Sequence, residues 1–206
     1  MMRPAETVNG DWITRWQRVA RRIRVPLGFV TAGLYLFELW RRAPRPAAIG
    51  WSLILVLPGL WLRAYASGYV KKNQELATTG PYAYTRNPLY LGSMMMAAGF
   101  AVALGSWPVA VVLAIGFFAI YVPVIASEER FLRAAFPDFD QYCRRVPRLI
   151  PRLRADRGAG QRTAGRFLLR LYLKHREYNA LLGVVLLYFS LFFLRPVLFF
   201  IFHGRP

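Results

Sequence analysis

Long apolar blocks separated by arginine-rich connectors constrain this chain more than any other feature. A helix needs about 20 predominantly apolar residues to cross the hydrocarbon core of a bilayer. The blocks that approach this length predict about five membrane spans, at residues 25–40, 47–62, 89–104, 107–126 and 178–202. The predicted fold class is therefore all-α, a polytopic integral membrane protein.

The charge of the chain fits the same interpretation. It has 28 Lys and Arg against 10 Asp and Glu, a net charge of +18, although 56% of its 206 residues are hydrophobic. Basic residues can neutralise nucleic acid phosphates. Here they flank apolar blocks, a placement that the positive-inside rule and anionic lipid headgroups explain more simply. We therefore expect membrane lipids, and no nucleic acid, as partners.

The distribution of basic residues predicts the orientation. Residues 130–176 contain 13 Lys and Arg against 3 acidic residues, so this segment is expected on the cytoplasmic side of the membrane, which we expect to be the cell inner membrane. The uncharged turn at 105–108 would then face outward. The N-terminal 24 residues lack a small-residue cleavage site after the first apolar block, so a removable signal peptide is not expected.

Length predicts one membrane domain over residues 1–206, with a basic linker at 152–177 and a final membrane helix at 178–202. Within the linker, 158–165 is expected to be flexible. Residues 166–176 suit either an amphipathic interfacial helix or a solvated linker.

Metal chemistry has little support in the sequence. Cys143 is the single cysteine, and His175 and His203 lie far apart in the chain. No spacing typical of metal ligands is present, so we expect neither a disulfide nor a bound metal.

The segment 79–93 holds the first candidate site, with the sequence Thr-Gly-Pro-Tyr-Ala-Tyr-Thr-Arg-Asn-Pro-Leu-Tyr-Leu-Gly-Ser. Asn87-Pro88 predicts a helix start, because asparagine is a favoured N-cap and proline suits the first helical position. The free N–H groups of such a helix accommodate an anion. Gly92 would let a ligand or a neighbouring helix approach closely. An ordinary capped membrane helix with interfacial tyrosines has the same pattern.

Glu128 and Glu129 form the second candidate site, directly after the fourth predicted span. Adjacent helical residues diverge by about 100°, so the two carboxylates cannot share one role. One is expected to accept hydrogen bonds from a ligand while the other pairs with an arginine. An ordinary helix end, with Glu129 paired to Arg133, is the alternative.

A third segment, 136–151, reads as a turn, an aromatic-bearing helix and an extended strand framed by Pro147 and Pro151. The strand is expected to form a lid or wall of a pocket.

In this order, the three segments resemble the family of membrane methyltransferases that contains isoprenylcysteine carboxyl methyltransferases and phospholipid N-methyltransferases. The resemblance covers residues 79–151, which would form the core of the domain. It implies the cofactor S-adenosylmethionine, bound in a pocket at the cytoplasmic face. It implies Arg86 and Tyr90 as catalytic residues, and Arg86 and Arg148 as substrate-binding residues. The cofactor site that it implies consists of Tyr82, Asn87, Pro88, Tyr90, Leu91, Gly92, Glu128, Glu129, Leu149, Ile150 and Pro151.

The resemblance leaves the lipophilic acceptor open between an isoprenylcysteine-type carboxylate and a phospholipid amine. Asn87 stands where the prenylcysteine branch has histidine, and Ser93 matches the phospholipid branch, whereas Tyr142 and the ending at 148–151 resemble the prenylcysteine branch. An NADPH-dependent membrane reductase of the sterol type and a non-catalytic membrane protein are the alternative functions. The sequence does not predict an oligomeric state.

Overall fold

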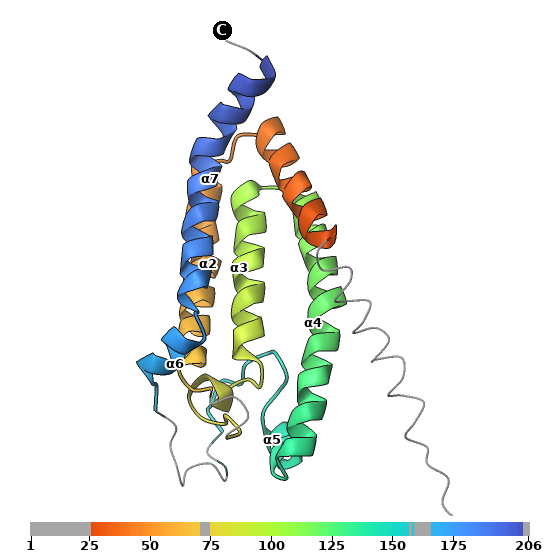
Figure 1. Cartoon of the computed structure of the whole chain (residues 1–206), viewed down its shortest axis with the longest axis vertical. Helices are drawn as coiled ribbons and strands as arrows, with labels where there is room; N and C mark the ends of the chain where they lie inside the picture. The colour runs from red at the N-terminus through yellow and green to blue at the C-terminus, as the bar shows by residue number, and fades with distance from the viewer. Residues whose placement is uncertain (1–25, 71–74, 157, 159–165, 204–206) are drawn as a thin grey trace, which may run out of the picture.

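The computed structural model describes residues 26–70, 75–156, 158 and 166–203. These residues are helical and contain no β-strand, which confirms the all-α prediction. The long helices run along the main axis of the molecule (Figure 1); they are a helix at residues 26–41, α2 (Pro46–Ser67), α3 (Pro88–Leu104), α4 (Trp107–Ala135) and α7 (Tyr178–His203).

Three short helices gather at one end of the molecule, which we call the base: η1 (Gly80–Ala83), α5 (Phe139–Arg145) and α6 (Leu169–Lys174). At the base α2 and α4 end, and α3 and α7 begin. Segments far apart in the sequence therefore meet there. The segment predicted as an extended strand near 146–151 also lies at the base, in irregular conformation.

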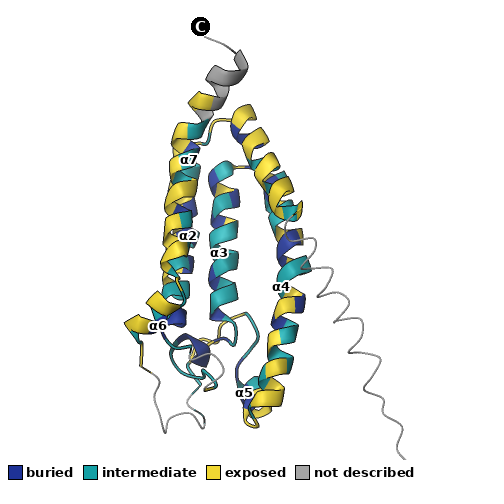
Figure 2. Ribbon diagram, viewed as in Figure 1, coloured by how far each residue is buried: buried dark blue, intermediate teal, exposed yellow. Residues whose placement is uncertain are grey.

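The long helices expose apolar side chains on their outer faces, as the exposed positions along α2, α4 and α7 in Figure 2 show. Trp51, Trp61 and Phe118 are each more than 60% exposed. A water-soluble protein rarely leaves so much contiguous apolar surface open, whereas lipid-facing helices do so by necessity.

Two of the predicted spans have the length and composition needed to cross a membrane. These are α2 and α4, with mean hydropathies of 1.6 and 2.7, and only 22% and 28% of their most apolar windows are buried. Such low burial is unlike the core helix of a soluble protein. The apolar helices Pro88–Leu104 and Tyr178–Leu194 are shorter, so the total of five spans stays a prediction.

Helices α2 and α3 form the most extensive packing between elements, and glycines make it possible. A Cβ atom on Gly59 would lie 2.7 Å from the carbonyl oxygen of Gly92, and one on Gly92 would lie 2.6 Å from the carbonyl oxygen of Gly59. The two backbones therefore touch, as at small-residue contacts between membrane helices. The sequence predicted that either a ligand or a neighbouring helix approaches Gly92 closely, and the structure shows that the neighbouring helix α2 does so.

The predicted tight turn between the third and fourth spans is present. Helix α3 ends at Gly105, which has a left-handed φ of 60°, and Ser106 caps α4 by accepting a hydrogen bond from the backbone N–H of Val109. Helix α4 continues beyond the predicted end at 126 to Ala135, so Glu128 and Glu129 lie inside the helix. Helix α3 packs far less on α4 than on α2.

The α2–α3 contact generates a stability prediction. A Cβ atom on Gly99 would lie 3.0 Å from the carbonyl oxygen of Ser52 and would collide with Val56. We therefore expect Gly99→Ala to lower the free energy of unfolding by about 1–3 kcal/mol, because the packed helices must separate. The control Gly50→Ala lies in open space in α2 and should raise it by up to about 1 kcal/mol through helix propensity. Thermal unfolding in detergent measures both, and equal stabilities would contradict the prediction.

Candidate active site

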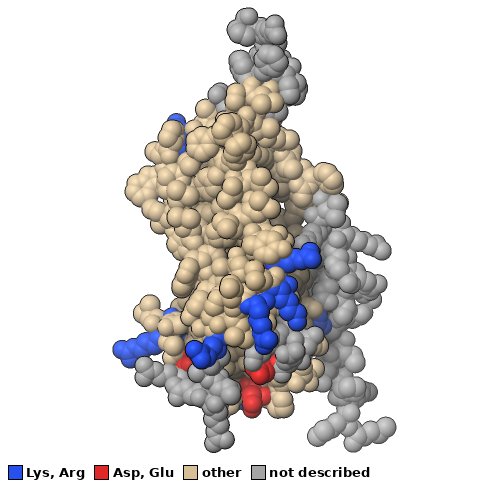
Figure 3. All heavy atoms as spheres, turned by 60° about the vertical axis from the view of Figure 1, so that its left-hand side comes forward, with Lys and Arg blue, Asp and Glu red and all other residues tan. Residues whose placement is uncertain are grey.

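A cavity of about 350 Å³ lies at the base of the molecule, between the start of α3 and the end of α4. Its volume falls within the range of about 300–1,000 Å³ typical of small-molecule sites. Polar and charged side chains from several segments line it, namely Arg63, Glu75, Tyr82, Arg86, Asn87, Tyr90, Glu128, Glu129 and Tyr142. Figure 3 shows that charged side chains gather around this end of the molecule, while most of the body above it is uncharged.

Glu129 joins three segments at the edge of this cavity. Its two carboxylate oxygens lie 3.2 Å from Arg86 and 3.2 Å from Arg148, and its side chain is only 15% exposed. The alternative pair with Arg133 is replaced, because Arg133 contacts Asp140 at 2.7 Å instead. Glu129 is therefore the carboxylate that pairs with arginine, and it does so twice.

Glu128 faces a different neighbour, as the helical divergence of the two carboxylates predicts. It accepts a hydrogen bond of 2.9 Å from the phenol of Tyr90 in the first turn of α3. The Tyr90 ring also packs edge-on against Tyr121 of α4, with 5.2 Å between ring centroids. Tyr90 thus contacts α4 through both its hydroxyl group and its ring.

The loop before α3 is held by the segment that follows α5. The backbone N–H of Arg86 donates to the Pro147 carbonyl at 2.9 Å, and the Asn87 amide donates to the Arg148 carbonyl at 2.9 Å. Thr85, which is buried, donates to the Leu149 carbonyl at 3.1 Å. These contacts fix the position from which Arg86 reaches Glu129.

Two tyrosines form the buried floor of the site. The Tyr142 phenol donates to the Tyr82 carbonyl at 2.7 Å. Burial raises the pKa of both phenols above the ordinary value of 10, and the neighbouring Arg86 opposes the rise at Tyr142 only in part. Both groups are therefore neutral hydrogen-bond donors at physiological pH.

The start of α3 differs from an ordinary capped helix. Asn87 is the N-cap residue and Pro88 opens the helix, as the sequence predicts, but the Asn87 side chain makes no capping hydrogen bond. It bonds to Arg148 instead. The free N–H groups at a helix start favour an anion, and here this end of α3 borders the cavity.

The cavity brings together most of the residues that the sequence singled out. Those that line it are Tyr82, Arg86, Asn87, Pro88, Tyr90, Glu128 and Glu129. Gly92 faces α2, and Arg148 reaches the site through Glu129. Ile150 is 82% exposed, and neither it nor Leu91, Leu149 or Pro151 is among the lining residues. Their roles at the cofactor stay predictions.

Sequence reasoning missed Arg63, which lines the cavity from α2. The signal was available, because an arginine within an apolar block is costly in a membrane unless it faces a partner or a site. The sequence did not show that α2 runs alongside the start of α3.

A second cavity, of about 580 Å³ and almost entirely apolar lining, lies farther from the base. The helix at 26–41, α3, α4 and α7 line it. Tyr121 and Ser93 line its end nearest the base. Because Tyr121 contacts Tyr90, the polar and apolar cavities adjoin at this tyrosine pair.

Residues 51–138 match the family model described as phospholipid methyltransferase. The chain is 43% identical over 99 residues to the cobalt-zinc-cadmium resistance protein CzcN of Cupriavidus metallidurans, a match covering 48% of this chain and 45% of that protein. It is 43% identical over 94 residues to the nickel-cobalt-cadmium resistance protein NccN of Alcaligenes xylosoxydans xylosoxydans, covering 46% and 43%.

A third relative is the protein-S-isoprenylcysteine O-methyltransferase of Schizosaccharomyces pombe, 33% identical over 84 residues, which cover 39% of this chain and 36% of that enzyme. The matches therefore span less than half the length of each of these relatives. No solved structure gives a significant match. The matched segment 51–138 contains the start of α3 and both glutamates, so the similarity to phospholipid methyltransferases covers the two main elements of the candidate site.

Proposed function

We propose that this protein transfers a methyl group from S-adenosylmethionine to a lipophilic acceptor at the cytoplasmic face of a membrane. The observation that carries the proposal is the junction of two cavities at Tyr90 and Tyr121, one polar and one apolar. A water-soluble donor and a lipophilic acceptor need adjoining sites of this kind. The similarity of residues 51–138 to phospholipid methyltransferases, and of part of the chain to an isoprenylcysteine O-methyltransferase, supports the same chemistry.

The charges around the polar cavity suit S-adenosylmethionine. Three carboxylates (Glu75, Glu128 and Glu129) and two guanidinium groups (Arg63 and Arg86) line it. A sulfonium and an ammonium group give the cofactor a net positive charge at neutral pH, despite its carboxylate. A lining with an excess of carboxylates favours such a ligand, and the start of α3 offers N–H groups to the ligand's carboxylate.

Each polar residue has a proposed role. Glu128, which is more exposed than Glu129, accepts hydrogen bonds from the cofactor's ribose or ammonium group. Glu129 holds Arg86 and Arg148 in place, and these arginines bind the polar end of the acceptor. Both leave a buried Nε atom without a hydrogen-bond partner in the described part of the chain. Leu149, Ile150 and Pro151 are proposed to close over the adenine.

When bound, the cofactor supplies a methyl group activated by a positively charged sulfur. Transfer is a displacement in which the acceptor's lone pair forms the new bond while the bond to sulfur breaks, so it requires alignment above all. Tyr90 is placed to provide that alignment, because it borders the polar cavity and touches the lining of the apolar one. The neutral phenols of Tyr82 and Tyr142 add a rigid, water-poor floor.

The apolar cavity is proposed to hold the acceptor's hydrocarbon part, and the acceptor is an isoprenylcysteine-type carboxylate or a phospholipid amine. The chain is proposed to cross the bilayer several times with the base in the cytoplasm, where its basic side chains meet anionic headgroups. A sterol-type reductase is the rival. Preference for NADPH over S-adenosylhomocysteine in a competition experiment would favour the reductase.

The donor site generates a prediction about ligand affinity. We expect Glu129→Gln to weaken S-adenosylhomocysteine binding by at least about tenfold, since Glu129 lines the donor cavity and Arg86, which lines the same cavity, loses its paired carboxylate. Isothermal titration calorimetry on detergent-solubilised protein measures the affinity. The control Asp138→Asn changes an exposed carboxylate outside the cavity and should leave the affinity unchanged. Intact binding in Glu129→Gln combined with Tyr90→Phe would overturn the site assignment.

A second prediction concerns the acceptor. Ala97 lines the apolar cavity from α3, and Ala97→Phe would fill part of it. We expect methylation of a membrane lipid extract, followed with labelled S-adenosylmethionine, to fall about tenfold or more, while S-adenosylhomocysteine binding persists. Val111→Phe, on the exposed side of α4, is the matched control. Equal loss in both variants would exclude the apolar cavity as the acceptor site.

A further inference from the structure

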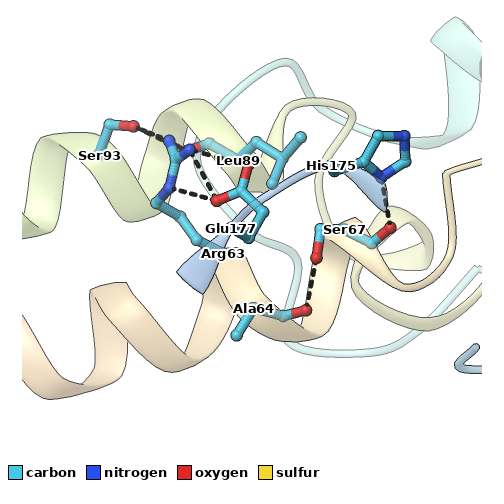
Figure 4. Close-up of polar contacts among 7 residues, drawn as sticks. All are labelled: Arg63, Ala64, Ser67, Leu89, Ser93, His175 and Glu177. Atoms are coloured by element: carbon cyan, nitrogen blue, oxygen red, sulfur yellow. Dashed lines mark hydrogen bonds and ion pairs between the residues drawn. The ribbon is translucent and has the colours of Figure 1, made fainter. Parts of the chain in front are cut away.

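Arg63 and Glu177 form a partly buried ion pair, and the proposed chemistry assigns no role to Glu177. The Nε and Nη2 atoms of Arg63 donate to both carboxylate oxygens of Glu177, at 2.8–3.1 Å. Their side chains are 22% and 12% exposed. Figure 4 shows the two side chains facing each other between α2, the start of α3 and the start of α7.

Arg63 extends this pair to α3. Its Nη1 atom donates to the Leu89 carbonyl at 3.3 Å and to the Ser93 hydroxyl group. Leu89 and Ser93 flank Tyr90 on the first turns of α3. Every guanidinium nitrogen of Arg63 is therefore engaged within the protein. Arg86 and Arg148 differ, because each leaves Nε without a hydrogen-bond partner among the described residues.

The backbone around the pair is shaped to allow these contacts. A Cβ atom on Gly92 would lie 2.7 Å from Cγ of Arg63, so the glycine leaves room for the arginine side chain to cross α3. On the other side, Arg176 has a left-handed φ of 54°, which is unfavourable for a residue with a side chain. This turn between α6 and α7 places Glu177 opposite Arg63, and such strain often accompanies a functional constraint.

Helix α7 has other attachments to the bundle. Tyr188 shares a hydrogen bond of 2.6 Å with Ser52 of α2, and Ser190 shares one with Tyr35. Just before α7, the His175 ring lies 3.2 Å from the Ser67 carbonyl oxygen (Figure 4). The Arg63–Glu177 pair is therefore not needed merely to attach α7. What the other attachments lack are the contacts that Arg63 makes with α3.

We infer that Glu177, acting through Arg63, is a positioning residue that fixes the first turns of α3 and with them Tyr90 in the methyl-transfer site. The inference rests on the proposed function for its catalytic consequence. The fixing of α3 by Arg63 does not rest on the proposed function, because the contacts of Arg63 to Leu89 and Ser93 exist without a ligand. Glu177 lies outside the segment that matches the family model, so the C-terminal part of the chain completes the site.

The test uses the full chain in lipid nanodiscs and compares Glu177→Gln with the wild type by hydrogen–deuterium exchange, without ligand. We expect exchange in the peptide covering 88–95 to accelerate by about tenfold or more, while the middle of α4 is unchanged. S-adenosylhomocysteine should bind more weakly. In the methylation assay, kcat should fall by a larger factor than the KM for S-adenosylmethionine rises. Asp140→Asn, which removes the exposed pair with Arg133, is the matched control and should change none of these.

Arg63→Lys provides the second variant, in case Glu177→Gln does not fold. Lysine keeps a charge for Glu177 but cannot serve the glutamate, Leu89 and Ser93 in the fork geometry of arginine. It should loosen the start of α3 while α7 stays protected. Faster exchange confined to α7, with α3 and ligand affinity unchanged, would overturn the inference. A wild-type protein that binds no S-adenosylhomocysteine would instead refute the proposed function, and the exchange of α3 would still test the positioning role.

Discussion

The polar bridges between the end of α4 and the start of α3 hold the candidate site together. Helix α4 packs little on α3 along most of its length, so the bundle alone does not fix the distance between Glu129 and Arg86. The ion pairs of Glu129 and the hydrogen bond from Tyr90 to Glu128 set that distance at the base. A carboxylate as buried as Glu129 requires such partners, because an unpaired charge at that depth is strongly unfavourable.

The weak contact between α3 and α4 has a second consequence. Where two long apolar helices diverge, the space between them is either filled by side chains or left open. Here it stays open as the apolar cavity, and the helix at 26–41 and α7 enclose it from the other sides. Tight α2–α3 packing through Gly59 and Gly92 compensates for this, because it fixes α3 to a rigid partner on one side while the other side stays accessible.

Three arginines around the candidate site fall into two classes by their hydrogen bonding. Arg63 has a partner for each guanidinium nitrogen and acts within the protein. Arg86 and Arg148 share one carboxylate and keep an unpartnered Nε. Since a buried donor without a partner is unfavourable, residues of the second class are the ones that a ligand would satisfy.

The sequence by itself determined the helical class, the hairpin at 105–106 and the helix start at Asn87-Pro88. It also determined that Glu128 and Glu129 face different partners. These follow from local rules of hydropathy, capping and helical geometry, which act over a few residues. Only the tertiary structure decided that Arg63 joins the site, that Gly92 faces α2, and that Ile150 is exposed. Each depends on which distant segments pack together at the base, and that choice is made by contacts between helices that no local pattern records.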